Sequence, residues 1–257
     1  MTNQQMINVA VSGAMGKLGS VISSGIAAAE DMRLSGLYAP GHEGKSFAGL
    51  DISGESKKLS AQVMVECAHP GVVMDNLKTW HQQGFSVIVG TSGFTENRLA
   101  ELRSFWGSKD QGCLVVPNFS VGAVLMMRFA ELAAPYFDSV EIVERHGEGK
   151  PDAPSGTALA TAMRIGKHRA DSAPTPANEI IDGARGGLAS GVRVHSLRMA
   201  GLLSDQEVAF SNNGETFSLN HRSTSYDSFV GGALLAIRHI EKMKGVSVGL
   251  DAVLGLQ

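Results

Sequence analysis

Short apolar runs alternate with longer amphipathic stretches over residues 1–120. The runs are typical of strands buried in a sheet, and apolar positions three or four apart are typical of helices that cover one. Strands are predicted at 7–11, 32–38, 62–67, 86–89 and 113–116. Helices are predicted from Leu18, from Pro70 to Gly84, and over 96–106. This alternation predicts an α/β fold, with a parallel sheet covered by helices on both faces.

The pattern changes after residue 120. The spacing predicts helices over 121–137 and 155–167, strands at 140–146, 192–199, 207–210 and 216–221, and a polar excursion over 169–190. Asn212-Asn213-Gly214 is typical of a hairpin turn. We therefore expect a second, α+β block with antiparallel strands. An amphipathic helix over 229–243 is expected to return to the first lobe.

Composition narrows the class of protein. Hydrophobic residues make up 43% and charged residues 18% of the 257 residues, as in an ordinary globular protein. The net charge is −3 with no basic stripe, so a nucleic-acid partner is not expected. No apolar run is long enough to span a membrane, and Met1–Gln5 is polar, which favours a cytoplasmic protein. Cys67 and Cys113 are expected to be buried thiols, and no metal site is predicted.

Glycines are spaced as Gly13-x-x-Gly16-x-x-Gly19 between the first predicted strand and the first predicted helix. Glycine lets a backbone approach a pyrophosphate closely, and the start of a helix presents free N–H groups to it. A tight structural turn would carry the same residues. The context at a strand-to-helix junction favours a dinucleotide site.

The sequence leaves the choice between NADH and NADPH open. A carboxylate about 20 positions after the glycines would bind the ribose hydroxyl of NAD, but Leu37-Tyr38-Ala39-Pro40 has none, and the next is Glu43. Lys17, His42 and Lys45 would suit a 2′-phosphate, or are solvated loop cations.

The segment 144–157 carries the candidate chemistry. A strand is predicted to end at His146, and a helix to begin near Ser155. The amides of Ser155, Gly156 and Thr157 would be unpaired at that helix start and would suit a carboxylate. Lys150 adds a positive charge, and His146 can transfer a proton near neutral pH. These groups suit reduction of a conjugated imine of a small dicarboxylate, in which the anion formed by hydride addition must be protonated.

The same segment resembles the signature of the 4-hydroxy-tetrahydrodipicolinate (dihydrodipicolinate) reductase family of lysine and diaminopimelate biosynthesis. The matching residues are Glu144, His146, Lys150 and Asp152 to Ala158. Two further stretches, 90–94 and 117–122, resemble the family's second glycine turn and its interdomain segment. The resemblance extends from the first strand to Leu254.

The resemblance implies a Rossmann-type dinucleotide-binding domain over 1–119 and 230–257, and a substrate-binding and tetramerisation domain over 120–229. It implies NADPH or NADH as cofactor, a homotetramer, His146 as acid/base and Lys150 as proton donor. Lys150, Ser155, Gly156 and Thr157 would bind the substrate. The cofactor would be lined by Gly13, Ala14, Met15, Gly16, Lys17, Leu18, Gly90, Thr91, Ser92, Val116, Pro117, Asn118 and Phe119.

The chain departs from the family pattern at three places. Gly147 stands where a second histidine is usual, Glu66-Cys67-Ala68 replaces an Asp-Phe-Thr-like strand end, and Tyr226 replaces an arginine. These departures leave two alternatives: a paralogous reductase of a different cyclic imine or keto acid, and a non-catalytic dinucleotide-binding homologue. Retention of His146 and Lys150 argues against the second, since a sensor needs no proton donor.

Overall fold

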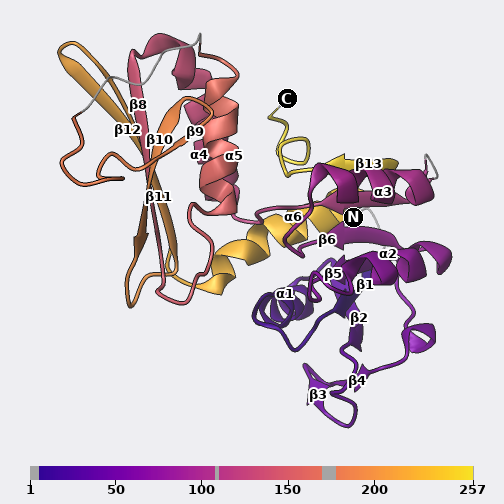
Figure 1. Ribbon diagram of the computed structural model, residues 1–257. Helices are drawn as coiled ribbons and strands as arrows, with labels where there is room; N and C mark the ends of the chain where they lie inside the picture. The colour runs from indigo at the N-terminus through magenta and orange to yellow at the C-terminus, as the bar shows by residue number, and fades with distance from the viewer. Residues whose placement is uncertain (1–5, 108–109, 170–177, 257) are drawn as a thin grey trace. The chain divides into compact units, whose positions relative to one another are not determined.

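The computed structural model describes residues 6–107, 110–169 and 178–256. The chain forms two compact units, one made of residues 1–119 and 226–257 and the other of residues 120–225. The first unit holds a predominantly parallel eight-stranded sheet and the second a mixed five-stranded sheet (Figure 1). The predicted class, α/β with a Rossmann-type lobe and a second α+β lobe, is confirmed.

The strand order in the first unit is β13-β7-β6-β5-β1-β2-β4-β3. The strands are β1 Ile7–Ser12, β2 Met32–Tyr38, β3 Ser46–Phe47, β4 Leu50–Ser53, β5 Val63–Glu66, β6 Ser86–Val89, β7 Gly112–Val115 and β13 Gly245–Val248. The helices are α1 Lys17–Ala28, α2 Val73–Gln82, α3 Glu96–Trp106 and α6 Val230–Ile240, with short 3₁₀ turns at Ser56–Lys58 and Tyr226–Phe229. Among the described strands of this eight-stranded sheet, β3 alone runs antiparallel to its neighbour.

Helices cover both faces of this sheet. Ala10, Met64 and Val87 belong to the core formed with α2 and α3. Their fully buried neighbours, such as Val11 and Ile88, point to the opposite face because side chains alternate along a strand. There α1 packs against α6. Burial on both faces explains why the strands are continuous apolar runs rather than alternating ones.

The second unit has the strand order β12-β11-β8-β10-β9, with α4 and α5 packed on each other. Its strands are β8 Ser139–His146, β9 Gly187–Ala189, β10 Val192–Arg198, β11 Ser204–Asn212 and β12 Glu215–Ser223. Its helices are α4 Val121–Ala133, followed by a 3₁₀ turn at Ala134–Tyr136, and α5 Gly156–Gly166. The hairpin predicted at Asn212 to Gly214 joins β11 to β12.

Several predicted elements need correction. The strands of the second unit are not all antiparallel: β10 pairs with β8 in parallel, because α5 carries the chain back to the same end of the sheet. Helix α2 begins at Val73 rather than Pro70, since residues 69–72 form a turn closed by the Val72 amide and the His69 carbonyl. The short strands β3, β4, β9 and β13 were not predicted, and β9 lies inside the predicted excursion.

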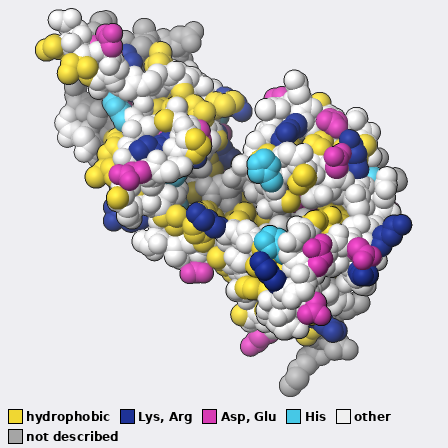
Figure 2. All heavy atoms as spheres, turned by 60° about the horizontal axis from the view of Figure 1, so that its bottom comes forward, with side chains coloured by type: hydrophobic (Ala, Val, Ile, Leu, Met, Phe, Trp, Pro, Cys, Tyr) yellow, Lys and Arg dark blue, Asp and Glu magenta, His cyan; other side chains and the backbone are white. Residues whose placement is uncertain are grey.

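The described helices are all too short or too polar to cross a membrane. On the face drawn in Figure 2, lysine and arginine side chains are interspersed with acidic ones. Both cysteines are free thiols, and burial raises the pKa of Cys67 and of Cys113 far above its ordinary value. Neither thiol is therefore a reactive thiolate at neutral pH.

Candidate functional site

The glycine loop lies where the strand order of the first sheet reverses. From β1 the chain adds β2 and β4 on one side, and β5, β6 and β7 on the other. Open α/β sheets bind ligands at the carboxyl ends of strands at such a switch point. Gly13 follows β1 directly, and Gly16 is the N-cap of α1 without a side-chain cap. The start of α1 therefore presents backbone groups to an anion.

Close backbone packing explains the glycines in this loop. Gly13 has a φ of +72°, and a Cβ there would lie 2.6 Å from the carbonyl of Cys67 on the neighbouring strand end. A Cβ on Gly19 would lie 2.3 Å from the carbonyl oxygen of Gly13. The Gly13 amide donates to the Tyr38 carbonyl at 2.9 Å. The loop is thus fixed against the ends of β2 and β5.

Three of the predicted cofactor-lining segments meet in the first unit. A Cβ on Gly90 would lie 2.6 Å from the Phe119 ring and 3.1 Å from the Leu18 side chain. Phe119 is 3% exposed, whereas Asn118 is half-buried and Pro117 exposed. Val116 continues β7, with its amide donating to the Val89 carbonyl at 2.8 Å. The structure thus brings the glycine loop, the 90–92 turn and the 116–119 segment together.

The unusual strand end Glu66-Cys67-Ala68 is held from within the core. The buried Glu66 carboxylate accepts hydrogen bonds from Trp80 Nε1 at 2.7 Å, Asn76 Nδ2 at 3.1 Å and the Ala68 amide at 2.8 Å. Burial raises the pKa of Glu66, although these hydrogen bonds oppose the rise. The Thr91 hydroxyl donates to the Ala68 carbonyl at 2.9 Å. Glu66 therefore joins α2 to the turn that follows β5.

In the second unit, the end of β8 presents Glu144 and His146 on one face, since they are two residues apart. That face is covered by α5, because Gln206, which lies opposite Glu144 on β11, donates to Thr161 of α5 at 2.8 Å. The Glu144 carboxylate hydrogen-bonds to His146 Nδ1. The Glu144 side chain has no exposed surface, and 12% of the His146 side chain is exposed.

Arg198, on the neighbouring strand β10, completes the surroundings of Glu144. Its Nη2 donates to Oε1 at 2.9 Å and its Nη1 to Oε2 at 3.1 Å, so the pair is bidentate. Arg198 Nη2 also donates to the Asp152 carbonyl. One guanidinium therefore ties the carboxylate to the loop between β8 and α5. Sequence reasoning missed Arg198, since only the parallel register of β10 and β8 brings it there.

The start of α5 differs from the expectation in one respect. The Ser155 amide donates to Glu144 Oε1 at 3.3 Å, so this amide is not unpaired as predicted. Its acceptor is a buried carboxylate 11 residues earlier in the chain, which the pattern at the helix start does not reveal. The Ser155 hydroxyl caps the helix by accepting from the Ala158 amide at 3.2 Å. Within the described ranges the Gly156 amide has no protein acceptor, and a Cβ on Gly156 would meet nothing within 4 Å.

Lys150 lies in the same loop and is paired with a carboxylate. Its Nζ contacts both oxygens of Asp152, at 2.7 and 2.9 Å. The Lys150 side chain is 28% exposed and that of Asp152 is 54% exposed, so water reaches this pair. An incoming carboxylate can therefore replace Asp152 at Lys150. We call Glu144, His146, Lys150, Asp152 and Arg198 the acid-base cluster.

Burial and the neighbouring charges together determine the pKa of His146. Burial lowers the pKa of the imidazole, Glu144 raises it, and Lys150 and Arg198 lower it, with a net fall below the ordinary value. Burial raises the pKa of Glu144, but the hydrogen bonds from Arg198, Ser196 and His146 lower it further than burial raises it. At neutral pH the ligand-free cluster therefore holds an ionised Glu144 and a neutral His146.

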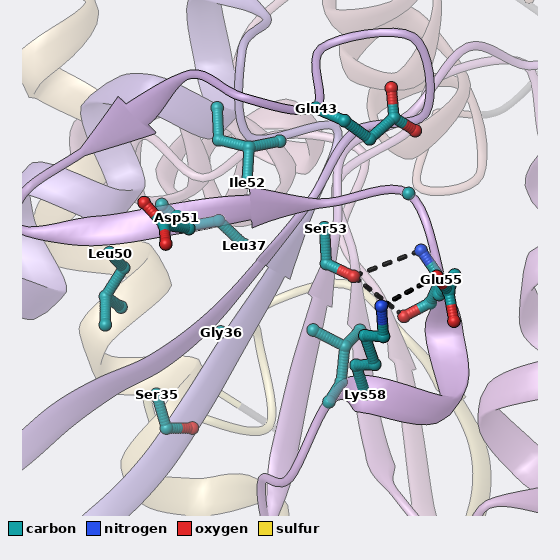
Figure 3. Close-up of a pocket in the computed structure, with 12 residues that line it drawn as sticks. Ser35, Gly36, Leu37, Glu43, Leu50, Asp51, Ile52, Ser53, Glu55 and Lys58 are labelled. Atoms are coloured by element: carbon teal, nitrogen blue, oxygen red, sulfur yellow. Dashed lines mark hydrogen bonds and ion pairs between the residues drawn. The ribbon is translucent and has the colours of Figure 1, made fainter.

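A cavity of about 520 Å³ lies elsewhere, beside β2 and β4 of the first unit (Figure 3). It is lined by Glu43, Asp51 and Glu55, and by Lys58, whose Nζ is already 2.7 Å from Glu55. None of the predicted site residues lines it. Its carboxylates make it unsuited to the phosphates of a dinucleotide.

Comparison with known proteins decides the family. Residues 7–119 match the family model for the N-terminus of dihydrodipicolinate reductase, and residues 122–254 match the model for its C-terminus. The chain belongs to the dihydrodipicolinate reductase family. The 4-hydroxy-tetrahydrodipicolinate reductase of Streptomyces coelicolor is 45% identical over 97% of this chain and 98% of its own length. The reductase of Nocardia farcinica is 43% identical, covering 97% and 99%.

A solved structure supports the same family membership. Dipicolinate-bound dihydrodipicolinate reductase from Paenisporosarcina sp. TG-14 is 32% identical, with a TM-score of 0.85 over 96% of this chain and 99% of that one. Membership of the dihydrodipicolinate reductase family confirms the predicted enzyme class, an oxidoreductase that uses NADPH or NADH.

Proposed function

We propose that the chain reduces 4-hydroxy-tetrahydrodipicolinate to tetrahydrodipicolinate with NADPH or NADH, in lysine and diaminopimelate biosynthesis. The observation that carries this proposal is the acid-base cluster at the start of α5, in a chain whose two halves both match the family. The dipicolinate bound to the Paenisporosarcina enzyme supports a small dicarboxylate as substrate.

The reaction transfers one hydride and one proton to the substrate. Loss of the hydroxyl as water leaves a conjugated imine, and one hydride and one proton then add across it. When bound, the reduced dinucleotide supplies the hydride. We assign its binding to Gly13 to Leu18, Gly90 to Ser92 and Val116 to Phe119, because the close-packed glycines and the uncapped start of α1 fit a dinucleotide.

We assign substrate binding and proton transfer to the second unit. The amides of Gly156 and Thr157 and the Lys150 ammonium bind a substrate carboxylate, with the dipole of α5 adding to the attraction. Lys150 leaves Asp152 for the substrate and donates the proton to the ring carbon. His146, neutral before substrate binds, accepts and returns protons at Nε2.

A turnover assay tests this proposal. The substrate is generated in situ from pyruvate and aspartate semialdehyde, reduced dinucleotide is added, and the loss of nicotinamide absorbance is followed. Rapid oxidation that depends on the substrate is the expected result. Tight binding of the dinucleotide without turnover would contradict the proposal and would favour a non-catalytic homologue.

A paralogous reductase is the second candidate, because of Gly147. A Cβ at this position would lie 3.0 Å from the Leu202 carbonyl, so the loop is packed too closely for the family's second histidine without a shift. One substrate contact expected in the family is therefore missing. Faster turnover of a related cyclic imine or keto acid than of the in situ substrate would favour this candidate.

We further propose a cytoplasmic homotetramer in which the second unit supplies the subunit contacts. Strand β12 is largely exposed although it carries apolar side chains, and Phe217 on it is 38% exposed. Leu188 and Met199 of the same unit are each 53% exposed. Apolar groups of this kind are typical of surfaces that pack against another subunit. Light scattering coupled to gel filtration will distinguish a tetramer from a monomer or dimer.

A further inference from the structure

Glu144 uses all of its hydrogen-bonding capacity inside the protein. Its two oxygens accept from two nitrogens of Arg198, from the Ser155 amide and from His146 Nδ1, and Ser196 contributes a further side-chain hydrogen bond. A carboxylate without exposed surface is unfavourable unless donors surround it. The arrangement therefore indicates a carboxylate held for its effect on its neighbours, and not for direct contact with a ligand.

Its position links the separate parts of the acid-base cluster. It contacts the proton-transfer residue His146 on its own strand and the start of α5 through Ser155. Through Arg198 it is also joined to the carbonyl of Asp152, the residue whose carboxylate holds Lys150. Displacement of this one side chain would therefore disturb the imidazole, the helix start and the lysine-bearing loop together.

The contact also determines the tautomer of His146. An ionised carboxylate has no proton to donate, so Nδ1 of a neutral imidazole must carry the hydrogen of this bond. Nε2 is then left with its lone pair and faces away from Glu144. Arg198 balances the charge of Glu144, so a dicarboxylate substrate does not approach an uncompensated anion.

We infer that Glu144, held by Arg198, is a positioning residue that fixes His146 in its Nδ1–H tautomer and aligns it with the anion-binding start of α5. This inference rests on the proposed function and adds to it a residue that does not contact substrate. Carboxylates that orient a histidine in this way typically change activity by about 10- to 100-fold when they are removed, as measured in metal sites.

The test compares Glu144→Gln with Glu131→Gln in the full-length protein. Glu131 is a matched control, because it also contacts an arginine and a histidine, Arg128 at 2.9 Å and His168 at 3.1 Å, but lies in the last turn of α4. We expect Glu144→Gln to lower kcat about 10- to 100-fold, with dinucleotide Kd unchanged, and Glu131→Gln to keep wild-type kcat. Wild-type turnover in Glu144→Gln would overturn the inference while leaving the proposed function intact.

Two further readouts separate positioning from a general loss of structure. Nitrogen-15 NMR of the histidines, with His146 assigned by its absence in His146→Asn, should show the Nδ1–H tautomer in the wild type. Glu144→Gln should shift it toward Nε2–H, because the amide can donate to Nδ1. Since Glu144 raises the pKa of His146, the limb of the kcat/KM profile that His146 governs should move to lower pH in this variant.

The wild-type NMR measurement does not depend on the folding of any variant. An Nε2–H tautomer of His146 in the wild type at neutral pH would overturn the inference by itself. Absence of turnover in the wild type, together with the expected Nδ1–H tautomer, would instead count against the proposed function. The two failures are therefore distinguishable.

Discussion

The candidate sites of the two units are built in different ways. In the first unit the site is made of backbone, and glycines are required because a Cβ would collide with a neighbouring strand end, as at Gly13. In the second unit the candidate site adds charged side chains to the amides at the start of α5, and some of these side chains have partners on another strand, as with Glu144 and Arg198. Adding an atom should therefore damage the first site, whereas removing a charge should damage the second.

The largest effect is expected from His146→Ala and Lys150→Ala. Each should lower kcat by about 10²- to 10⁴-fold, because we assign proton transfer to these two side chains. Dinucleotide Kd, measured by fluorescence titration, should stay near the wild-type value. Full activity in either variant would contradict the assignment of proton transfer to that residue.

Gly13→Ala should show the opposite pattern. Its Cβ would lie 2.6 Å from the Cys67 carbonyl, and the residue has a φ of +72°. We expect dinucleotide Kd to rise about 10- to 100-fold, because the collision would displace the loop that we assign to the pyrophosphate. Gly41→Ala is the control, because Gly41 has a φ of +82° but nothing within 4 Å of a Cβ. Equal effects of the two variants would show that strain, and not the collision, is responsible.

Asp152→Asn should have a smaller effect on the second unit, in the direction of tighter substrate binding. Substrate would no longer compete with Asp152 for Lys150, so substrate KM should fall about 2- to 5-fold, as expected for a solvent-exposed ion pair. Glu148→Gln is the charge control, because Glu148 lies in the same loop and makes no ion pair within the described chain. A rise in KM for Asp152→Asn would show that Asp152 helps substrate to bind.

The smallest effect concerns stability in the first unit. Burial raises the pKa of Glu66 in the folded state, so its contribution to stability is full below the unfolded pKa and is lost as pH rises through the folded pKa. The free energy of unfolding of the wild type relative to Glu66→Gln should therefore decline with rising pH. Urea titrations at several pH values measure this difference. A difference that does not change with pH would show that Glu66 titrates at its ordinary pKa.

Sequence alone predicted most of the first unit because its signals are local. The strand ending at Ser12, the glycine spacing and the helix containing Ile22 lie within one short segment, and each element is specified by its own residues. The missed strands β3, β4 and β13 contain two to four residues and mix polar with apolar positions, whereas the equally short β6 contains a continuous apolar run. Helix α2 was predicted to begin too early because a proline also suits the turn before a helix.

The acid-base cluster was predicted only in part. His146, Lys150 and the start of α5 lie in one loop and form a local motif. Arg198 lies 54 residues after Glu144, and only the parallel pairing of β10 with β8 places it beside that carboxylate. The sequence predicts antiparallel strands here, so it gives no reason to place Arg198 beside Glu144, and it predicts an unpaired Ser155 amide.

A crystal structure with dipicolinate and NADPH bound tests the central assignment most directly. We predict that a dipicolinate carboxylate lies on the Gly156 and Thr157 amides, that Lys150 has moved from Asp152 to the ligand, and that His146 Nε2 faces the ring. The glycine loop after β1 should hold the pyrophosphate. Dipicolinate bound elsewhere, with Lys150 still on Asp152 and His146 turned away, would contradict the assignment.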